Sequence, residues 1–304
     1  MTRSAVGPGP LRLHHVDFGG PPCAPVVVCV HGLGGSHLNW DLLAPLLSAR
    51  YRVLAVDLPG FGLSPPRRGP ATVRRNVAAL AAFIRGCDGP VTLVGNSMGG
   101  LIAVLTAARH PELVRALALL DPALPAPGRV LRSPAGLAQL VAYAVPGVGE
   151  RLRRARRRRI GAHAAFAETL RTGGIDPESL PPDLVARSVA LVEQQDDVAG
   201  ADRAYLSASR SLAWAMVRAH AYYAAMAAVR APVLLVHGAQ DGLVPVGAAR
   251  AVVRRRPEWR YVELAGVGHM PQLQDPKRVI EVLVPWLDSM DEHQTPEVEP
   301  FLPP

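Results

Sequence analysis

The sequence predicts an α/β fold in which a mostly parallel sheet is flanked by helices. First, residues 26–30 form a continuous apolar run rich in valine, as expected for a strand buried on both faces of a parallel sheet. Second, such runs alternate along the chain with segments of helical pattern, which is typical of βαβ units. Third, the alternation stops at Pro122 and resumes at Pro232, which indicates a helical insertion.

Local patterns justify each element in turn. Predicted strands are short apolar runs that end at Gly, Asp or Pro, which mark turns, and predicted helices place Leu, Ala and Val on one face. In chain order these are an edge strand within 11–18, a strand at 26–30, a helix at 39–49 with Leu42, Leu43, Leu46 and Leu47 on one face, a strand at 51–56, a helix at 72–85, a strand at 91–94, a helix at 101–109, a strand at 115–120, strands at 233–236 and 259–264, and a helix at 276–289.

These elements divide the chain into a core and an insertion. Residues 1–121 and 231–289 are predicted to form the core, which carries the strands. Residues 122–230 are rich in Ala, Arg and Leu without convincing β-prone runs, and they are predicted to form an inserted helical cap. Residues 290–304 are acidic and proline-rich, so we expect this tail to be disordered.

Composition limits the class of protein. The 304 residues are 49% hydrophobic with a formal net charge of +8, which fits a globular chain and permits weak attraction to anionic surfaces. The three cysteines, Cys23, Cys29 and Cys87, form no C-x-x-C pair, as expected in a reducing compartment. We see no signal-peptide core and no apolar run of about 18 residues. The expected location is therefore the cytoplasm.

A serine marks the predicted reversal from the strand at 91–94 to the helix at 101–109. It lies in G-N-S-M-G-G, with Gly95 and Gly99 two positions to either side of Ser97. A G-x-S-x-G turn between a strand and a helix is a nucleophile elbow, which exposes the serine hydroxyl at the carboxyl edge of the sheet. The pattern therefore predicts that Ser97 is a nucleophile.

A serine hydroxyl needs a base, and the base needs an orienting acid. Asp241 follows the strand at 233–236 in H-G-A-Q-D, and His269 follows the strand at 259–264 in G-H-M-P. The chain order Ser97, Asp241, His269 is the order of one hydrolase family. Asp121 competes for the role of acid because it too follows a core strand, and we prefer Asp241 on strand order.

Five loops in register resemble those of the α/β-hydrolase family. They are H-G-L-G-G after the strand at 26–30, D-L-P-G-F-G-L-S after the strand at 51–56, the elbow, and the acid and histidine loops. The resemblance covers His31 to Asp288 and implies an α/β-hydrolase fold with an inserted cap. It also assigns structural roles: His31 shapes the loop beside an oxyanion hole, and we favour a structural role for His237. Asp57 is expected to fix its own turn.

The same resemblance implies a mechanism. Ser97 would attack a carbonyl carbon, His269 would shuttle the proton, and Asp241 would orient the imidazole. The backbone N–H groups of Leu33 and Met98 would form the oxyanion hole. The predicted activity is hydrolysis of carboxylic esters of small to medium apolar substrates through an acyl-enzyme. No phosphate loop, dinucleotide fingerprint or metal-ligand spacing occurs, so neither a cofactor nor a metal is predicted.

The substrate pocket is only weakly marked. Its predicted walls are Tyr143, Phe166, Trp214, Met216, Tyr222 and Tyr223 of the cap, with Asn96 and Met270 beside the triad. Packing of the cap against the core explains the cap residues equally well.

Departures from the family pattern rank the alternatives. Serine as nucleophile separates the chain from haloalkane dehalogenases and epoxide hydrolases, which resemble this fold but use an aspartate. The elbow is similar to that of carbon–carbon bond hydrolases of meta-cleavage pathways, but Met270 stands where those enzymes usually carry a tryptophan. Meta-cleavage activity is therefore the second interpretation. Serine perhydrolases or haloperoxidases share the triad, and a small-molecule receptor on a hydrolase scaffold is the non-enzyme alternative.

Seven arginines lie between Arg151 and Arg159. On one helix their mutual repulsion favours a solvated face of the cap or a flexible connection. Weak association with an anionic membrane is the functional alternative that we prefer, and no nucleic-acid partner is expected.

Overall fold

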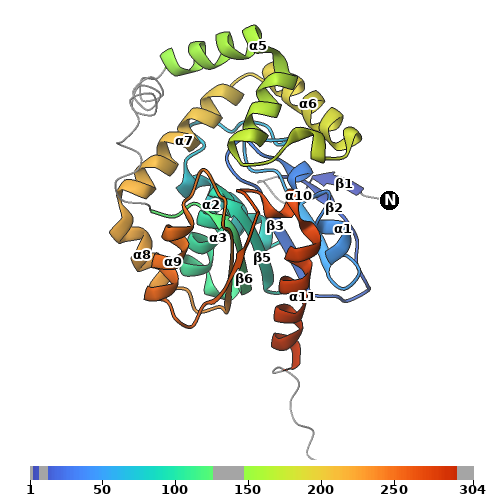
Figure 1. Cartoon of the computed structure of the whole chain (residues 1–304), viewed down its shortest axis with the longest axis vertical. Helices are drawn as coiled ribbons and strands as arrows, with labels where there is room; N and C mark the ends of the chain where they lie inside the picture. The colour runs from blue at the N-terminus through green and yellow to red at the C-terminus, as the bar shows by residue number, and fades with distance from the viewer. Residues whose placement is uncertain (1–2, 7–12, 126–146, 293–304) are drawn as a thin grey trace, which may run out of the picture.

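The computed structural model describes residues 3–6, 13–125 and 147–292 (Figure 1). These residues form an eight-stranded sheet in the order β1-β2-β4-β3-β5-β6-β7-β8. Two antiparallel strands, β1 (Arg3–Val6) and β2 (His14–Asp17), extend one edge of the sheet. The six parallel strands are β3 (Val26–Val30), β4 (Arg52–Val56), β5 (Val91–Ser97), β6 (Val114–Pro122), β7 (Val233–Gly238) and β8 (Arg260–Leu264). The predicted α/β fold with a mostly parallel sheet is confirmed.

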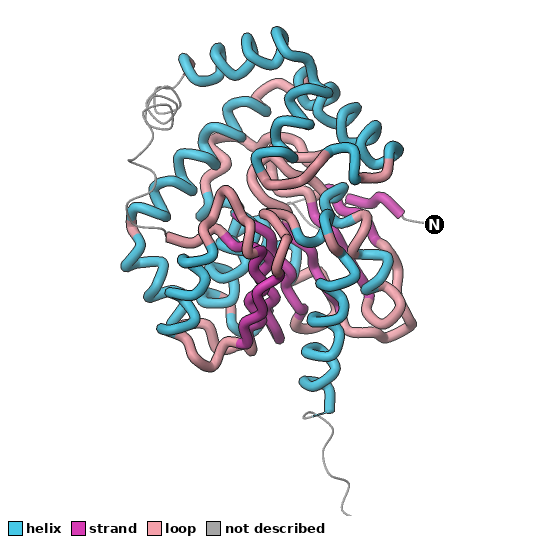
Figure 2. Tube along the Cα trace, viewed as in Figure 1, coloured by secondary structure: helices cyan, strands magenta, loops and turns pink. Residues whose placement is uncertain are grey.

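Helices cover both faces of this sheet (Figure 2). The side chains of β3 alternate between two hydrophobic clusters, with Val28 in one and Val27 in the other, as the two-residue period of a strand requires. The first cluster packs under α2 (Val73–Ile84), α3 (Met98–Arg109) and α9 (Val246–Arg255). The second packs under α1 (Ala44–Leu47) and α11 (Pro276–Glu292). Both faces are therefore apolar, which explains the continuous valine runs.

Three local predictions differ from the structure. The helix expected at 39–49 is a 3-10 turn, η1 (His37–Trp40), followed by the single turn of α1, and Leu46 is 42% exposed. Strand β1 was not predicted. Helix α11 continues to Glu292, so the first residues of the expected tail are helical, and residues 293–304 lie outside the described part of the chain.

Four helices occupy the described part of the segment between β6 and β7: α5 (Val148–Thr172), α6 (Pro182–Asp196), α7 (Ala201–Val217) and α8 (Ala219–Ala227). We refer to residues 147–229 as the insertion. Figure 1 shows α5, α6 and α7 arching over one end of the core. A Cβ on Gly34 would lie 3.0 Å from the Tyr205 ring, and a Cβ on Gly60 would lie 2.4 Å from Ala204. The insertion therefore packs on the loops that follow β3 and β4.

None of the helices in residues 3–6, 13–125 and 147–292 combines the length and apolar character that a membrane span requires.

Candidate active site

Ser97 ends β5 in a backbone conformation with φ of 52° and ψ of −119°. A positive φ is costly for a residue that carries a Cβ, and close packing of the next residues holds it. Gly99 lies so near β3 that a Cβ there would be 2.1 Å from the Val30 carbonyl oxygen. The Ala123 N–H also donates to the Ser97 carbonyl at 2.9 Å. The strand, turn and helix expected around this serine are all present.

The loop after β3 lies against the serine. A Cβ on Gly32 would lie 3.1 Å from the Ser97 Cβ, so glycine permits this approach. His31 shapes the loop, since its Nδ1 lies 2.7 Å from the Gly32 carbonyl oxygen and its Nε2 accepts the Leu58 N–H at 3.0 Å. Burial lowers the pKa of His31, which favours the neutral ring that this pattern requires. Leu33, one of the two predicted oxyanion donors, is the next residue in the chain after Gly32.

The second predicted oxyanion donor is Met98, which follows Ser97 as the first residue of α3. Both predicted N–H donors therefore belong to segments that adjoin the serine.

The predicted base and acid are joined. His269 Nδ1 lies 2.7 Å from Asp241 Oδ2, and both residues are buried. Asp241 Oδ1 accepts the backbone N–H groups of Leu243 and Val244 at 2.7 and 2.9 Å. Burial disfavours the charged carboxylate, but the hydrogen bonds from His269 and the two amides hold the pKa of Asp241 below its usual value. Asp241 is therefore an anion that fixes the orientation of the imidazole.

Two hydrogen bonds tie the His269 loop to its surroundings. The Asn96 amide donates from Nδ2 to the carbonyls of His269 and Leu120 at 3.0 and 2.9 Å, so this predicted pocket residue braces the elbow against the histidine loop. The His269 N–H donates to the Gly173 carbonyl of the insertion at 2.7 Å. Within the described residues no direct hydrogen bond joins Ser97 to His269, and such bonds are often long in unliganded enzymes.

Asp121 lies beside Asp241. Its Oδ1 accepts the Gly238 N–H at 2.8 Å, and His237 Nε2 lies 3.6 Å from the same oxygen. Burial, reinforced by the charge of Asp241, raises the pKa of Asp121 well above its usual value. The opposite shifts favour the negative charge on Asp241, which the imidazole contacts.

Two buried clusters offer the side chains that metals prefer: His14 with His37 and Asp57, and His237 with Asp121 and Asp241. Asp57 accepts four donors, the Nδ1 groups of His14 (2.7 Å) and His37 (2.9 Å) and the N–H groups of His37 (2.6 Å) and Leu63 (2.8 Å).

These donors explain the first cluster as a brace between β2, η1 and the turn after β4. They also lower the pKa of Asp57 although burial opposes its charge. In the second cluster, His237 Nε2 lies 3.0 Å from the Val244 carbonyl oxygen, which gives this histidine a structural partner.

The structure separates the predicted pocket residues. Trp214 is 60% exposed on α7, with the Arg218 guanidinium 5.8 Å from its ring centre, so it lines no enclosed pocket in this arrangement. Tyr222 is buried in the cluster under α3. Met270 and Phe166 of the insertion both pack against a third, smaller hydrophobic cluster.

Met216 and Tyr223 are partly buried and pack against the core, in keeping with the packing explanation. Tyr143 lies outside the described residues.

Comparison with known proteins places these features in a family. The model of the alpha/beta hydrolase fold matches residues 25–276. The chain is 30% identical over 265 residues to a pimeloyl-[acyl-carrier protein] methyl ester esterase of Aromatoleum aromaticum, covering 83% of this chain and 94% of that protein. It is 41% identical over 119 residues to lipase LipV of Mycobacterium tuberculosis, covering 39% of this chain and 45% of that protein. Less than half the length of LipV is thus matched.

Among solved structures, a 2-hydroxy-6-oxo-6-phenylhexa-2,4-dienoate hydrolase from Rhodococcus sp. strain RHA1 superimposes with a TM-score of 0.72. The sequence identity is 24%, and the match covers 96% of this chain and 99% of that one. At this identity the likeness shows a common fold.

The contact between His269 and Asp241 predicts a spectroscopic signature. A proton on Nδ1 in a short hydrogen bond to a buried carboxylate resonates far downfield in proton NMR. We expect the His269 signal in the wild type and in Asp121→Asn, because the imidazole contacts Asp241, and we expect Asp241→Asn to abolish it while signals from His14 and His37 beside Asp57 stay. A signal that survives Asp241→Asn and disappears in Asp121→Asn would transfer the role to Asp121.

Proposed function

Because the chain belongs to the alpha/beta hydrolase family, we propose that it is a serine hydrolase acting on carboxylic esters of small to medium apolar substrates. Ser97 is the proposed nucleophile, His269 the base and Asp241 the orienting acid. The observation that carries this proposal is the 2.7 Å contact between His269 Nδ1 and Asp241 Oδ2, in a loop that Asn96 ties to the elbow.

The proposed chemistry uses the geometry as follows. The Ser97 Oγ attacks the ester carbonyl while His269 Nε2 takes its proton, and the charge of Asp241 stabilises the imidazolium. The N–H groups of Leu33 and Met98 donate to the oxyanion, and removing one such donor typically costs about 3 kcal/mol. His269 then protonates the leaving alkoxide, which departs as the alcohol. Water, deprotonated by His269, attacks the acyl-enzyme, and His269 returns this proton to the Ser97 Oγ as the acid is released.

Two observations favour an ester over a carbon–carbon bond as substrate. The relative matched over 94% of its length is named as a methyl ester esterase. A dienoic acid hydrolase of Metapseudomonas resinovorans is 39% identical but is matched over 35% of its length, and the Rhodococcus dienoate hydrolase is alike in fold at 24% identity. Met270, the residue after the proposed base, also departs from the meta-cleavage pattern. Carbon–carbon bond hydrolysis remains the second candidate because the G-N-S-M-G-G elbow is similar to that of those enzymes.

The insertion is the proposed cap. Its Tyr205 contacts the loop at Gly34, and its Gly173 carbonyl accepts the His269 N–H. These contacts bring it to the two loops that would handle the oxyanion and the proton. A cytoplasmic location is proposed from the cysteines, all three of which are free thiols.

The first functional test removes the nucleophile. Ser97→Ala should lower kcat for p-nitrophenyl butyrate about 10⁶-fold, the loss typical of a deleted triad serine, and should abolish labelling by a fluorophosphonate probe. Ser48→Ala is the matched control, since this exposed hydroxyl donates to the Pro45 carbonyl. Undiminished turnover in Ser97→Ala would assign the nucleophile elsewhere.

The second test addresses the substrate class. We expect hydrolysis of p-nitrophenyl esters with short and medium acyl chains, and a much lower kcat/KM for a meta-cleavage dienoate assayed in parallel. Initial rates across the series measure the preference. A dienoate turned over faster than every ester would replace the proposal by carbon–carbon bond hydrolysis.

We also propose a weak association of α5 with anionic membranes. The arginines of residues 151–159 fall into two groups, those that face the neighbouring helix α7 and those that face outward. Arg153 and Arg157 face Asp202 of α7, with nitrogen–oxygen distances of 3.0 and 2.9 Å, so the expectation of one solvated face is wrong for these two. The part of α5 before Gly161 turns other side chains outward.

On this outward side, Val148 and Leu152 are 45% and 50% exposed and lie one helical turn apart. Arg151 and Arg158, also exposed, lie together along one side of this pair in the helical projection. Exposed apolar side chains bordered by arginine are typical of helices that lie in the headgroup layer of an anionic membrane. Because Val148 and Leu152 are exposed beside the arginines, this surface could contact lipids through apolar side chains as well as through charge.

Vesicle sedimentation tests this association. The protein should pellet with vesicles that contain phosphatidylserine and stay in solution with pure phosphatidylcholine. Arg158→Ala should weaken binding about fivefold, since a basic residue at such a surface contributes about 1 kcal/mol. Arg74→Ala, an exposed arginine on α2, is the control for net charge. Equal effects of the two substitutions would contradict a role for α5.

A further inference from the structure

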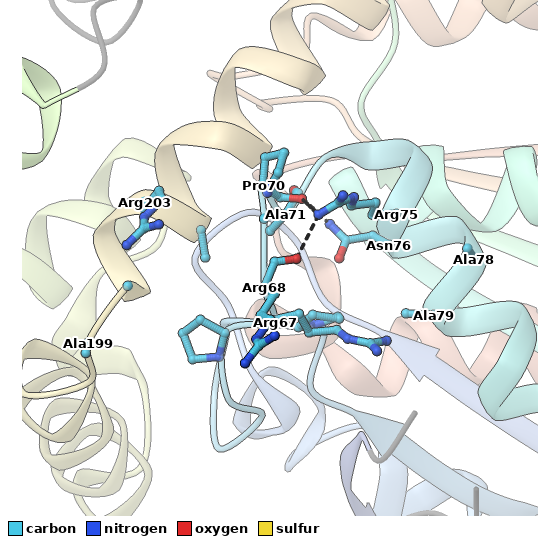
Figure 3. A pocket seen from close by; sticks show the side chains of 15 residues that line it. Arg67, Arg68, Pro70, Ala71, Arg75, Asn76, Ala78, Ala79, Ala199 and Arg203 are labelled. Carbon is cyan, nitrogen blue, oxygen red and sulfur yellow. Dashed lines mark hydrogen bonds between the residues drawn. The ribbon is translucent and has the colours of Figure 1, made fainter. Parts of the chain in front are cut away.

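A cavity of about 430 Å³ lies at the junction of the insertion and the core (Figure 3). Three segments supply its walls: the loop after β4, with Pro59 and residues 66–71, the first turns of α2, and the start of α7 with residues 199, 200, 203 and 204. Ser97, Asp241 and His269 do not line it. It is therefore a second concave site, separate from the proposed active site, and of the size that small-molecule ligands occupy.

The walls of this cavity carry charge of one sign. Arg67, Arg68, Arg75 and Arg203 line it, and none of the described lining residues is Asp or Glu. Figure 3 shows Arg203 on α7 on one side and Arg75 on α2 on the other, with the loop between them. Arg75 Nη1 donates to the Arg68 carbonyl at 3.0 Å, which holds that loop against α2. The four arginine side chains are exposed, and their shared positive charge favours an anion as the occupant of the cavity.

Two further features favour an anion that also carries a hydrogen-bond donor. Asn76 lines the cavity and is fully buried. Its Nδ2 donates to the Ala71 carbonyl at 3.3 Å, while its Oδ1 has no partner, and an unpaired buried acceptor is costly. Ala199 and Gly200 place the start of α7 at the wall, and Gly200 gives this helix no side-chain cap. A helix N-terminus attracts anions, and Arg153 and Arg157 neutralise the charge of Asp202 in the first turn of α7.

We infer that this cavity binds a small phosphate monoester that carries a free hydroxyl group. The arginines would hold the phosphate, for which the planar guanidinium fork is suited, and the Asn76 Oδ1 would accept the hydroxyl proton. Because α7 also contacts the loop at Gly34 through Tyr205, the bound ligand would fasten the insertion to the core. The inference requires no hydrolytic activity and therefore stands apart from the proposed function.

Isothermal titration calorimetry with glycerol 3-phosphate, inorganic phosphate and glycerol tests the site in the full-length protein. We expect glycerol 3-phosphate to bind with one site per chain, more tightly than inorganic phosphate, and glycerol not to bind. Arg67→Ala and Arg203→Ala remove exposed side chains, so the fold should survive, and each should weaken binding at least tenfold. Arg158→Ala makes the same charge change outside the cavity and should leave affinity within twofold.

Three results of these titrations would overturn the inference. These are the absence of glycerol 3-phosphate binding at millimolar concentration, equal weakening by Arg158→Ala and Arg203→Ala, and equal affinities for glycerol 3-phosphate and inorganic phosphate. Protein labelled at Ser97 by the fluorophosphonate should still bind glycerol 3-phosphate. Loss of binding after labelling would place the phosphate in the active site and so also overturn a separate cavity.

Discussion

The geometry of the site depends on one close approach, that of the start of α3 to the end of β3. Gly99 makes it sterically possible, and it holds Ser97 at a positive φ that costs on the order of 1–3 kcal/mol. The fully buried Met98 and Leu101 offset this cost through packing. Since β5 lies between β3 and β6, the turn presents the Ser97 side chain at the edge where the loops after β7 and β8 bring Asp241 and His269.

Electrostatics then decides which carboxyl group serves the imidazole. Two buried carboxyl groups in one low-dielectric site cannot both ionise without a large cost. Asp241 has a histidine and two backbone amides to stabilise its charge, whereas Asp121 has the Gly238 amide and an unpartnered Oδ2. The preference for Asp241 on strand order therefore has a physical cause, which is the number of donors each carboxyl group can reach.

The sequence was sufficient where local chemistry determines structure. Valine runs specify strands buried on two faces, and a serine between glycines specifies the elbow. It was insufficient to predict local structure that is determined by contacts with residues far away in the chain. The helix expected at 39–49 begins as a 3-10 turn because Ser36 and Asn39 form a capping box and Asp57 binds the His37 N–H. No local pattern marks Gly173 as a partner of His269, and composition does not tell which arginines of α5 face Asp202.

The insertion contacts the loops of the core that carry the proposed catalytic groups. It touches the core at the Gly34 loop, at the Gly60 turn and at the His269 backbone. The first adjoins a proposed oxyanion donor and the third carries the proposed base, while the second forms part of the junction that holds the arginine-lined cavity. A small rotation of α7 or of the end of α5 would therefore displace both loops relative to the elbow, because β3, β6 and α3 of the core hold the elbow. The catalytic geometry would thus depend on how firmly the insertion is seated on the core, and an anion in the cavity would act on that seating without contacting Ser97.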